Sequence, residues 1–267
     1  MNDRPAKSGT ARKKRRLLLL AGTFEARQVA RWLAERAGDR FEATASLAGV
    51  TDDPKPYPIT TRTGGFGGSD GLRDYLIANR IDVVVDATHP FAAQMSAHAT
   101  CACSAANVAL IRLERPPWYP RDGDAWTSIP CLASSKRLIA DDEHVLLATG
   151  SGSVGDAAAL AERLPGAQLT LRAVVRPAAN LPDNLRLLIA RPPFSENNER
   201  ALFQELGIAR LVTKNAGGRA GETKLAAARA LGLPVAMIAR PPRPSGPAHI
   251  CETVTDVGAA LNAFASG

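Results

Sequence analysis

The sequence predicts an α/β protein with two Rossmann-like, doubly wound domains, each built on a parallel sheet, that face each other across a cleft. Short apolar runs with strand character alternate with segments of helical periodicity along the whole chain. A length of 267 residues is enough for one to two domains. Residues 115–120 (RPPWYP) interrupt the alternation, because proline lacks an amide donor and restricts the residue before it.

The first half of the chain supplies one complete α/β series. Residues 25–37 repeat apolar side chains on one helical face, and the apolar residues 17–21 precede them as a short buried strand. The same reasoning predicts strands at 41–47, 81–86 and 108–113 and helices at 69–79 and 91–106. We therefore expect a first α/β domain over residues 17–142, with a linker near 115–142.

The second half repeats the alternation. It predicts strands at 144–148, 169–175, 185–189, 209–213 and 234–238, and helices at 156–164, 196–206, 221–231 and near 255–265. These elements form an expected second α/β domain over residues 143–267. The cleft between the two domains is the predicted ligand site.

The net charge of +7 comes mostly from one end of the chain. Residues 1–16 contain seven Lys or Arg side chains and one acid, so the body is nearly neutral. We expect this segment to be a disordered basic tail, and we assign it no function. Only 5% of the residues are aromatic and none alternate with basic residues, so no nucleic-acid partner is expected. A non-catalytic nucleotide-binding α/β protein remains an alternative.

Neither a leader nor a membrane span is expected. The basic tail and the apolar run that follows it imitate a signal peptide, but the apolar run is short and charged residues begin at Glu25. No apolar stretch approaches the ~20 residues of a membrane span. Four scattered cysteines suggest neither a metal site nor a disulfide framework. These features predict a cytoplasmic protein with no membrane partner.

Small and polar residues follow the predicted strands of the first domain. Because ligands of parallel sheets bind beyond the carboxyl ends of the strands, these loops suit a nucleotide. The expected cofactor-binding residues from this pattern are Gly22, Thr23, Glu25, Ser46, Ala48, Gly49, Gly65, Phe66, Gly67, Gly68 and Thr88. His89 in the same region has two interpretations, a hydrogen-bonding residue at a helix start or a catalytic residue.

A competing motif lies in the second domain. Residues 150–155 (GSGSVG) match G-x-G-x-x-G after a strand and before a helix. The acidic residue that would confirm dinucleotide binding is absent, and Arg172 and Arg176 occupy that region instead. Those arginines could accept a phosphate or a substrate carboxylate. The loop is therefore a cofactor contact, a substrate contact or a tight turn.

Seven motifs in a fixed order now point to a known family. They are AGTFEA (21–26), SLAG (46–49), GGFGG (64–68), DATHPFAAQ (86–94), RLERPPW (112–118), ATGS (148–151) and TKNAGG (213–218). Together they closely resemble the precorrin-6A reductase family of cobalamin biosynthesis, over about residues 17–240. DATHPFA and GGFGG are the specific motifs.

The resemblance implies a function and its partners. It implies an oxidoreductase in which NADPH, with NADH as the alternative, adds hydride to the tetrapyrrole precorrin-6A to give precorrin-6B. It places the cofactor in the first domain and the macrocycle in the cleft. Cobalt-precorrin-6A is the alternative substrate, and neighbouring pathway enzymes are conceivable partners. The absence of a Tyr-x-x-x-Lys pair argues against a short-chain dehydrogenase acting on a small carbonyl compound.

The chain departs from the family in two loops. An arginine often follows SLAG, but here Val50 stands there and Asp52 and Asp53 follow it. We therefore expect Arg62, just before GGFGG, to contact the 2′-phosphate instead. After ATGS this chain has residues 152–155 (GSVG), so we expect backbone amides to make the substrate contacts there.

A polycarboxylate substrate requires cations and hydrogen-bond donors. Lys214 is expected to bind a carboxylate of the macrocycle, while His89 is a candidate proton donor with a pKa free to move near neutrality. The full set of expected substrate-binding residues is His89, Pro90, Phe91, Gly150, Ser151, Thr213, Lys214 and Asn215. No metal ligand is expected.

Overall fold

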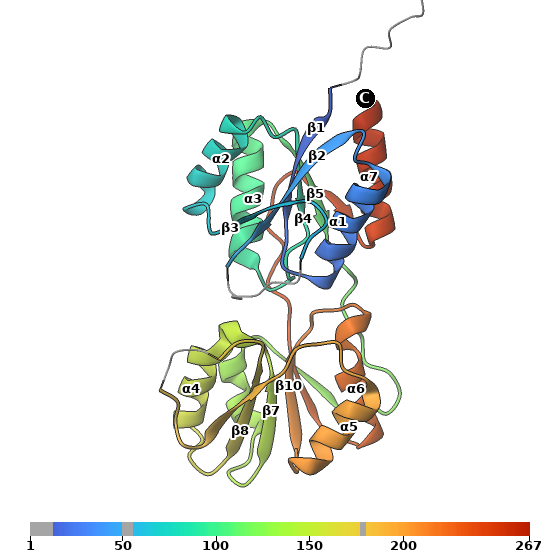
Figure 1. The fold of residues 1–267 in the computed structure, drawn as a ribbon. Helices are drawn as coiled ribbons and strands as arrows, with labels where there is room; N and C mark the ends of the chain where they lie inside the picture. Colours follow the sequence, from blue (N-terminus) through green and yellow to red (C-terminus); the bar gives the residue numbers. More distant parts are fainter. Residues whose placement is uncertain (1–12, 50–55, 177–179) are drawn as a thin grey trace, which may run out of the picture. The chain divides into compact units, whose positions relative to one another are not determined.

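The computed structural model describes residues 13–49, 56–176 and 180–267, which form two compact units (Figure 1). Unit 1 runs to Thr88 and also comprises Gln94–Glu114 and Pro244–Gly267. Unit 2 comprises His89–Ala93 and Arg115–Arg243. The predicted basic tail lies outside the described residues up to position 12.

Unit 1 contains a six-stranded parallel sheet, sheet A, in the order β12-β5-β4-β1-β2-β3. Its strands are β1 (Arg15–Leu20), β2 (Phe41–Leu47), β3 (Thr60–Thr63), β4 (Val83–Asp86), β5 (Ala109–Leu113) and β12 (His249–Cys251). Its helices are α1 (Phe24–Arg36), α2 (Gly68–Ala78), α3 (Ala93–Ala106) and α7 (Val254–Ser266). Helices α1 and α7 cover one face and α2 and α3 the other (Figure 1).

Unit 2 contains a second six-stranded parallel sheet, sheet B, in the order β6-β11-β10-β7-β8-β9. Its strands are β6 (Trp126–Ile129), β7 (His144–Ala148), β8 (Gln168–Ala173), β9 (Leu185–Ile189), β10 (Arg210–Lys214) and β11 (Val235–Ile238). Its helices are α4 (Val154–Glu162), α5 (Glu196–Glu205) and α6 (Thr223–Ala230), with short 3₁₀ turns η1 (Leu132–Leu138), η2 (Ser151–Ser153) and η3 (Arg219–Gly221). The predicted fold class is confirmed.

Both sheets are buried on both faces, which explains the unbroken apolar runs in the sequence. Along β1, Leu17 and Leu19 pack into the core beneath α1 and α7, while Leu18 and Leu20 pack beneath α2 and α3. All four side chains are almost completely buried. Alternation of side chains along a strand therefore feeds two cores rather than one core and solvent.

The division into units differs from the predicted boundary at residue 142. Strand β6 follows β5 in the chain but pairs with β11 in sheet B, and β12 follows β11 but pairs with β5 in sheet A. The segment 115–142 therefore belongs to unit 2, and 244–267 belongs to unit 1 rather than to a domain spanning 143–267. Sheet A is completed by β12, which comes from the far end of the chain, an arrangement that alternation along the sequence does not reveal.

Most predicted elements lie within a few residues of their observed bounds. Helix α3 begins at Ala93 rather than at residue 91, because the segment before it forms a turn closed by a hydrogen bond from Ala92 N to His89 O. Strands β3, β6 and β12 were not predicted. Within the described part of the chain, no helix is both long and apolar enough to cross a membrane.

Candidate functional site

The first candidate region lies at the carboxyl edge of sheet A, where the strand order reverses between β1 and β4. Such a reversal is where parallel α/β sheets bind ligands. Gly22 and Thr23 follow β1, and Thr88 follows β4. The Thr23 hydroxyl accepts a hydrogen bond from Ala26 N and donates one to Ala87 O, so it caps α1 and ties the two loops together.

A buried carboxylate fixes the DATHPFA loop. Asp86 Oδ1 accepts hydrogen bonds from the backbone N–H and the hydroxyl of Thr88, at 3.2 and 2.7 Å. Its Oδ2 accepts from Ser96 Oγ at 2.6 Å and from Arg112 Nε at 3.3 Å, in an ion pair that is almost fully buried. The first residue of the motif therefore positions the loop, and its charge is balanced inside the protein.

The GGFGG loop presents open backbone. Gly64, Gly67 and Gly68 have positive φ angles of 114°, 79° and 93°, and a Cβ added at any of them would meet no heavy atom within 4 Å. At Gly71 an added Cβ would lie 1.8 Å from the Phe66 carbonyl oxygen, so the loop is pressed against the start of α2. This open, glycine-lined backbone fits the close approach of a dinucleotide.

Arg62 lies at the end of β3 with its guanidinium held in one place. Its Nη1 donates to Ser46 Oγ at 2.6 Å and to Gly64 O at 3.0 Å, and its Nη2 donates to Gly65 O at 3.2 Å. The guanidinium also stacks over Phe66, 4.1 Å from the ring centroid. The structure thus joins several predicted cofactor residues through one cation.

The remaining cofactor candidates occupy the same edge. Glu25 lies in the first turn of α1, and Ala48 and Gly49 form an exposed turn after β2. Val50, Asp52 and Asp53, where the chain departs from the family pattern, lie outside the described residues.

The second candidate region is the corresponding reversal in sheet B, between β7 and β10. Here the glycine-rich segment 150–155 forms η2 and the start of α4. The Ser151 hydroxyl accepts hydrogen bonds from Val174 N and Val175 N, so it braces the end of β8. The loop therefore makes a tight internal turn, while Gly150 faces open space.

Lys214, His89 and Phe91 come together in this region. The Lys214 ammonium donates to Ser153 Oγ at 3.2 Å and lies 5.5 Å from the centroid of the Phe91 ring. The rings of His89 and Phe91 are 5.8 Å apart. Burial lowers the pKa of Lys214, with Asp156 acting in the opposite direction.

His89 lies in a positive environment. Loss of hydration among the surrounding protein atoms lowers its pKa to about 3, and the charges of Arg115, Lys214, Lys224 and Arg240 act in the same direction. Its Nδ1 accepts a hydrogen bond from Phe91 N–H at 3.2 Å, so the neutral ring carries its proton on Nε2. The expectation of a pKa near neutrality does not fit these surroundings.

The TKNAGG segment is folded tightly against RPPW. Asn215 uses its side-chain amide on the backbone of Trp118, accepting from its N–H at 2.8 Å and donating to its C=O at 3.0 Å. Thr213 is buried, and its hydroxyl donates to Ala148 O. These two predicted substrate-binding side chains therefore make intramolecular bonds, which leaves Lys214 as the cation that the segment presents.

Two arginines hold the backbone of the same segment. Arg115 Nε donates to Ala216 O at 2.7 Å, and Arg240 Nε donates to Asn215 O at 2.8 Å. At Gly217, where φ is 66°, an added Cβ would lie 2.1 Å from the Pro116 carbonyl oxygen and 2.5 Å from Arg240 Nη2. Only glycine fits at this crossing.

Arg172 is not an anion-binding residue, contrary to one interpretation of the sequence. Its guanidinium makes two hydrogen bonds, of 2.7 and 2.6 Å, to the buried carboxylate of Glu199 on α5. The pair is internally neutral, so it has no charge to offer a ligand. Arg176, the second candidate, is exposed.

Sequence reasoning missed three of the cations that surround His89: Arg115, Lys224 and Arg240. Lys224 lies at the start of α6, 4.8 Å from the Trp118 ring, and burial is the main cause that lowers its pKa to about 8. Arg115 lies in the RLERPPW motif, but no motif marks Lys224 or Arg240, and nothing in the sequence shows that the three converge on His89. Within the part of the chain that the structure describes, no cluster of His, Cys, Asp and Glu could hold a metal ion.

Comparison with known proteins decides the family. The model of the precorrin-6x reductase family CbiJ/CobK matches residues 16–264. The chain belongs to this family. It is therefore an oxidoreductase of cobalamin biosynthesis, and the resemblance noted in the sequence is confirmed.

Several family members are close in sequence and structure. Precorrin-6A reductases of Rhodobacter capsulatus and Rhodococcus erythropolis are each 44% identical to this chain, over 91% and 92% of it and 94% and 96% of their own lengths. The cobalt-precorrin-6A reductase of Methanothermobacter thermautotrophicus is 30% identical over 88% of this chain and 79% of its own. A solved structure, CobK precorrin-6A reductase, superposes with a TM-score of 0.86 at 43% identity, covering 93% of this chain and 96% of its own.

Proposed function

We propose that this chain reduces precorrin-6A to precorrin-6B by hydride transfer from NADPH. The similarity to precorrin-6A reductases over nearly the whole chain carries the proposal. It disfavours the alternative of a non-catalytic nucleotide-binding protein. The metal-free substrate is preferred because the relatives named for it reach 44% identity, whereas those named for cobalt-precorrin-6A reach 30%.

The cofactor would lie along the carboxyl edge of sheet A. When bound, NADPH supplies the hydride, and the protein supplies position and local charge. The open backbone of Gly22, Gly67 and Gly68 would admit the pyrophosphate, and Arg62 would take the 2′-phosphate. A guanidinium has five N–H donors, and the three that hold Ser46 and the GGFGG loop leave two for a ligand.

The macrocycle would be recognised by the positive region of unit 2. Its carboxylates need fixed cations. Arg115, Lys224 and Arg240 add positive charge around His89. The apolar ring of Phe91 provides a surface on which a flat macrocycle can pack.

His89 would bind substrate through its Nε2–H while the ring is neutral. A neutral imidazole is a hydrogen-bond donor but not an acid of useful strength at neutral pH. Loss of hydration is the main cause that lowers the His89 pKa, and carboxylates that bind Lys214 and its neighbours would offset the second cause, the positive charges. His89 could then become a proton donor only in the substrate complex.

One experiment tests the proposal. The purified protein is incubated with precorrin-6A and NADPH, and cofactor absorbance and the tetrapyrrole spectrum are followed together. We expect cofactor oxidation and a matching spectral change, faster with NADPH than with NADH and with precorrin-6A than with cobalt-precorrin-6A. Spectral change with neither macrocycle would refute the reaction, and a preference for NADH would refute the cofactor assignment.

A further inference from the structure

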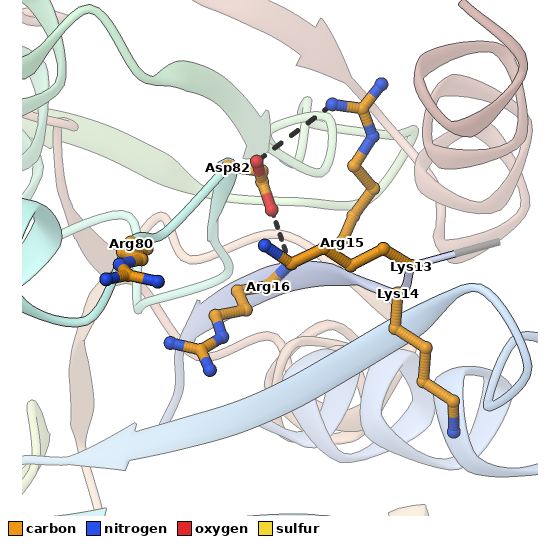
Figure 2. Close-up of a pocket in the computed structure, with 6 residues that line it drawn as sticks. All are labelled: Lys13, Lys14, Arg15, Arg16, Arg80 and Asp82. Carbon is orange, nitrogen blue, oxygen red and sulfur yellow. Dashed lines mark hydrogen bonds and ion pairs between the residues drawn. The ribbon is translucent and has the colours of Figure 1, made fainter.

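A basic hollow lies at the amino edge of sheet A, opposite the carboxyl edge that carries the cofactor candidates. It has a cavity volume of about 360 Å³. Figure 2 shows the residues that line it: Lys13, Lys14, Arg15, Arg16, Arg80 and Asp82. They come from the start of β1 and from the turn between α2 and β4. Neither the family motifs nor the proposed reaction uses any of them.

Asp82, the one acid among the described residues that line the basic hollow, is already engaged. Asp82 Oδ2 accepts a hydrogen bond from the Arg16 backbone N–H at 2.6 Å, and Oδ1 lies 4.0 Å from Arg15 Nη1 (Figure 2). The Arg16 guanidinium is partly balanced by Glu42 at 3.5 Å. The acid therefore joins two strand ends and does not neutralise the remaining cations.

Three cations of the basic hollow have no partner of their own. Among the residues that the structure describes, the side chains of Lys13, Lys14 and Arg80 have no hydrogen-bond or ion-pair partner, and all three residues are exposed. Like charges gathered in one hollow repel each other, so the unliganded protein gains nothing from this arrangement. A bound anion would remove the repulsion.

Arg80 occupies a backbone position that disfavours it. Its φ is 51°, and its N–H bonds to Ile77 O at the carboxyl end of α2, where glycine is the usual residue. Helices α5 and α6 end in the same hydrogen-bond pattern with Gly207 and Gly232, and α3 ends with Asn107. Asparagine tolerates this conformation, whereas arginine has no local reason to adopt it. Exposure of Arg80 rules out a packing reason as well.

We propose that the basic hollow binds a soluble oligophosphate. Guanidinium and ammonium groups together recognise phosphate oxygens, and the volume suits a small anion rather than a macromolecular surface. No aromatic ring lines the hollow within the described residues, so the phosphate chain, and not a stacked base, is the recognised group. The site is separate from the cofactor region, and its test does not depend on the proposed reaction.

The test compares two variants that make the same backbone change. Arg80→Gly removes the cation and relieves the left-handed backbone, so it should fold at least as well as the wild type. Asn107→Gly makes the equivalent change at the end of α3, at a residue that does not line the hollow. Isothermal titration with sodium tripolyphosphate is run on the wild-type chain and both variants.

We expect the wild-type chain and Asn107→Gly to bind tripolyphosphate equally, and Arg80→Gly to bind it about tenfold more weakly. At one concentration of tripolyphosphate, the midpoint of thermal unfolding should rise equally in the first two and less in Arg80→Gly. The kcat and KM of macrocycle reduction should be the same in Arg80→Gly as in the wild type, because Arg80 lies outside the proposed active region.

Four outcomes would overturn the proposal. They are no heat of binding in the wild type, unchanged affinity in Arg80→Gly, and equal affinity for citrate, which would indicate an unselective response to anions. The fourth is binding to vesicles that contain phosphatidic acid without any response to tripolyphosphate, which would indicate a membrane surface instead. Equal affinity for tripolyphosphate and ATP supports recognition of the phosphate chain.

Discussion

Replacing Arg62 with alanine separates NADPH from NADH. The guanidinium uses three N–H donors on Ser46, Gly64 and Gly65, which leaves two for the 2′-phosphate. A charge-assisted hydrogen bond contributes about 1.5–3 kcal/mol, and the half-exposed position favours the lower value. Loss of one or two such bonds should therefore weaken NADPH binding by about 10–100-fold.

NADH has no 2′-phosphate, so it should respond only to loosening of the GGFGG loop, by about threefold. Kd values for both cofactors are measured by titration of the free enzyme. Arg62→Lys keeps the charge but not the forked geometry, so it should fall between the wild type and Arg62→Ala. Arg73→Ala, which removes an exposed arginine of α2 paired with Asp70 and Asp74, is the matched control. Equal weakening of NADPH and NADH by Arg62→Ala would refute the phosphate assignment and leave Arg62 with a loop-holding role only.

Three further predictions concern unit 2. Lys214→Met should lower kcat/KM for the macrocycle by about 10–100-fold with unchanged NADPH affinity, and Lys214→Arg should retain part of the activity; normal substrate affinity with a shifted pH profile would instead make Lys214 the proton donor. Because the pKa of His89 is lowered to about 3, its ring stays neutral until the pH falls toward that value, so kcat/KM should show no break from His89 between about pH 5 and 8. A break near the ordinary histidine pKa that disappears in His89→Asn would contradict this. Gly217→Ala should lower the free energy of unfolding by about 2–3 kcal/mol, whereas Gly232→Ala, at a φ of 65° with open space, should lose only about 1 kcal/mol; equal losses in thermal unfolding would show that the contact with Pro116 is unimportant.

The sequence predicted the interior of each sheet better than its edges. Strands such as β1 and β4 are buried on both faces and show as apolar runs. Strand β3 is polar, and β6 and β12 are four and three residues long. The last two take their place only because a strand of the other half of the chain pairs with them. Pairing over such a distance leaves no local signal.

The candidate site was predictable where chemistry and backbone geometry are local. Glycines at strand ends marked the open GGFGG loop, and the position of Arg62 beside it marked a cation for that loop. Motif membership alone could not tell Lys214, which faces Phe91 and Ser153, from Asn215, whose amide is used by Trp118. The positive surroundings of His89 combine residues from four separate segments, so its low pKa was visible only in three dimensions.

The return of β12 to sheet A sets the order in which the two sheets can be completed during synthesis on the ribosome. Strands β1 to β5 emerge first, but β12 and α7, which places Val257 and Leu261 in the core of unit 1, are synthesised last. Until then the edge of β5 exposes unpaired backbone groups, and the early-made β6 waits for β11. Sheet B lies within the contiguous segment Arg115–Arg243, so its six strands can pair before β12 is made, whereas sheet A has to wait for the end of the chain. Loss of the last helix would therefore damage unit 1, whose first strands are translated first, and leave the strands of sheet B intact.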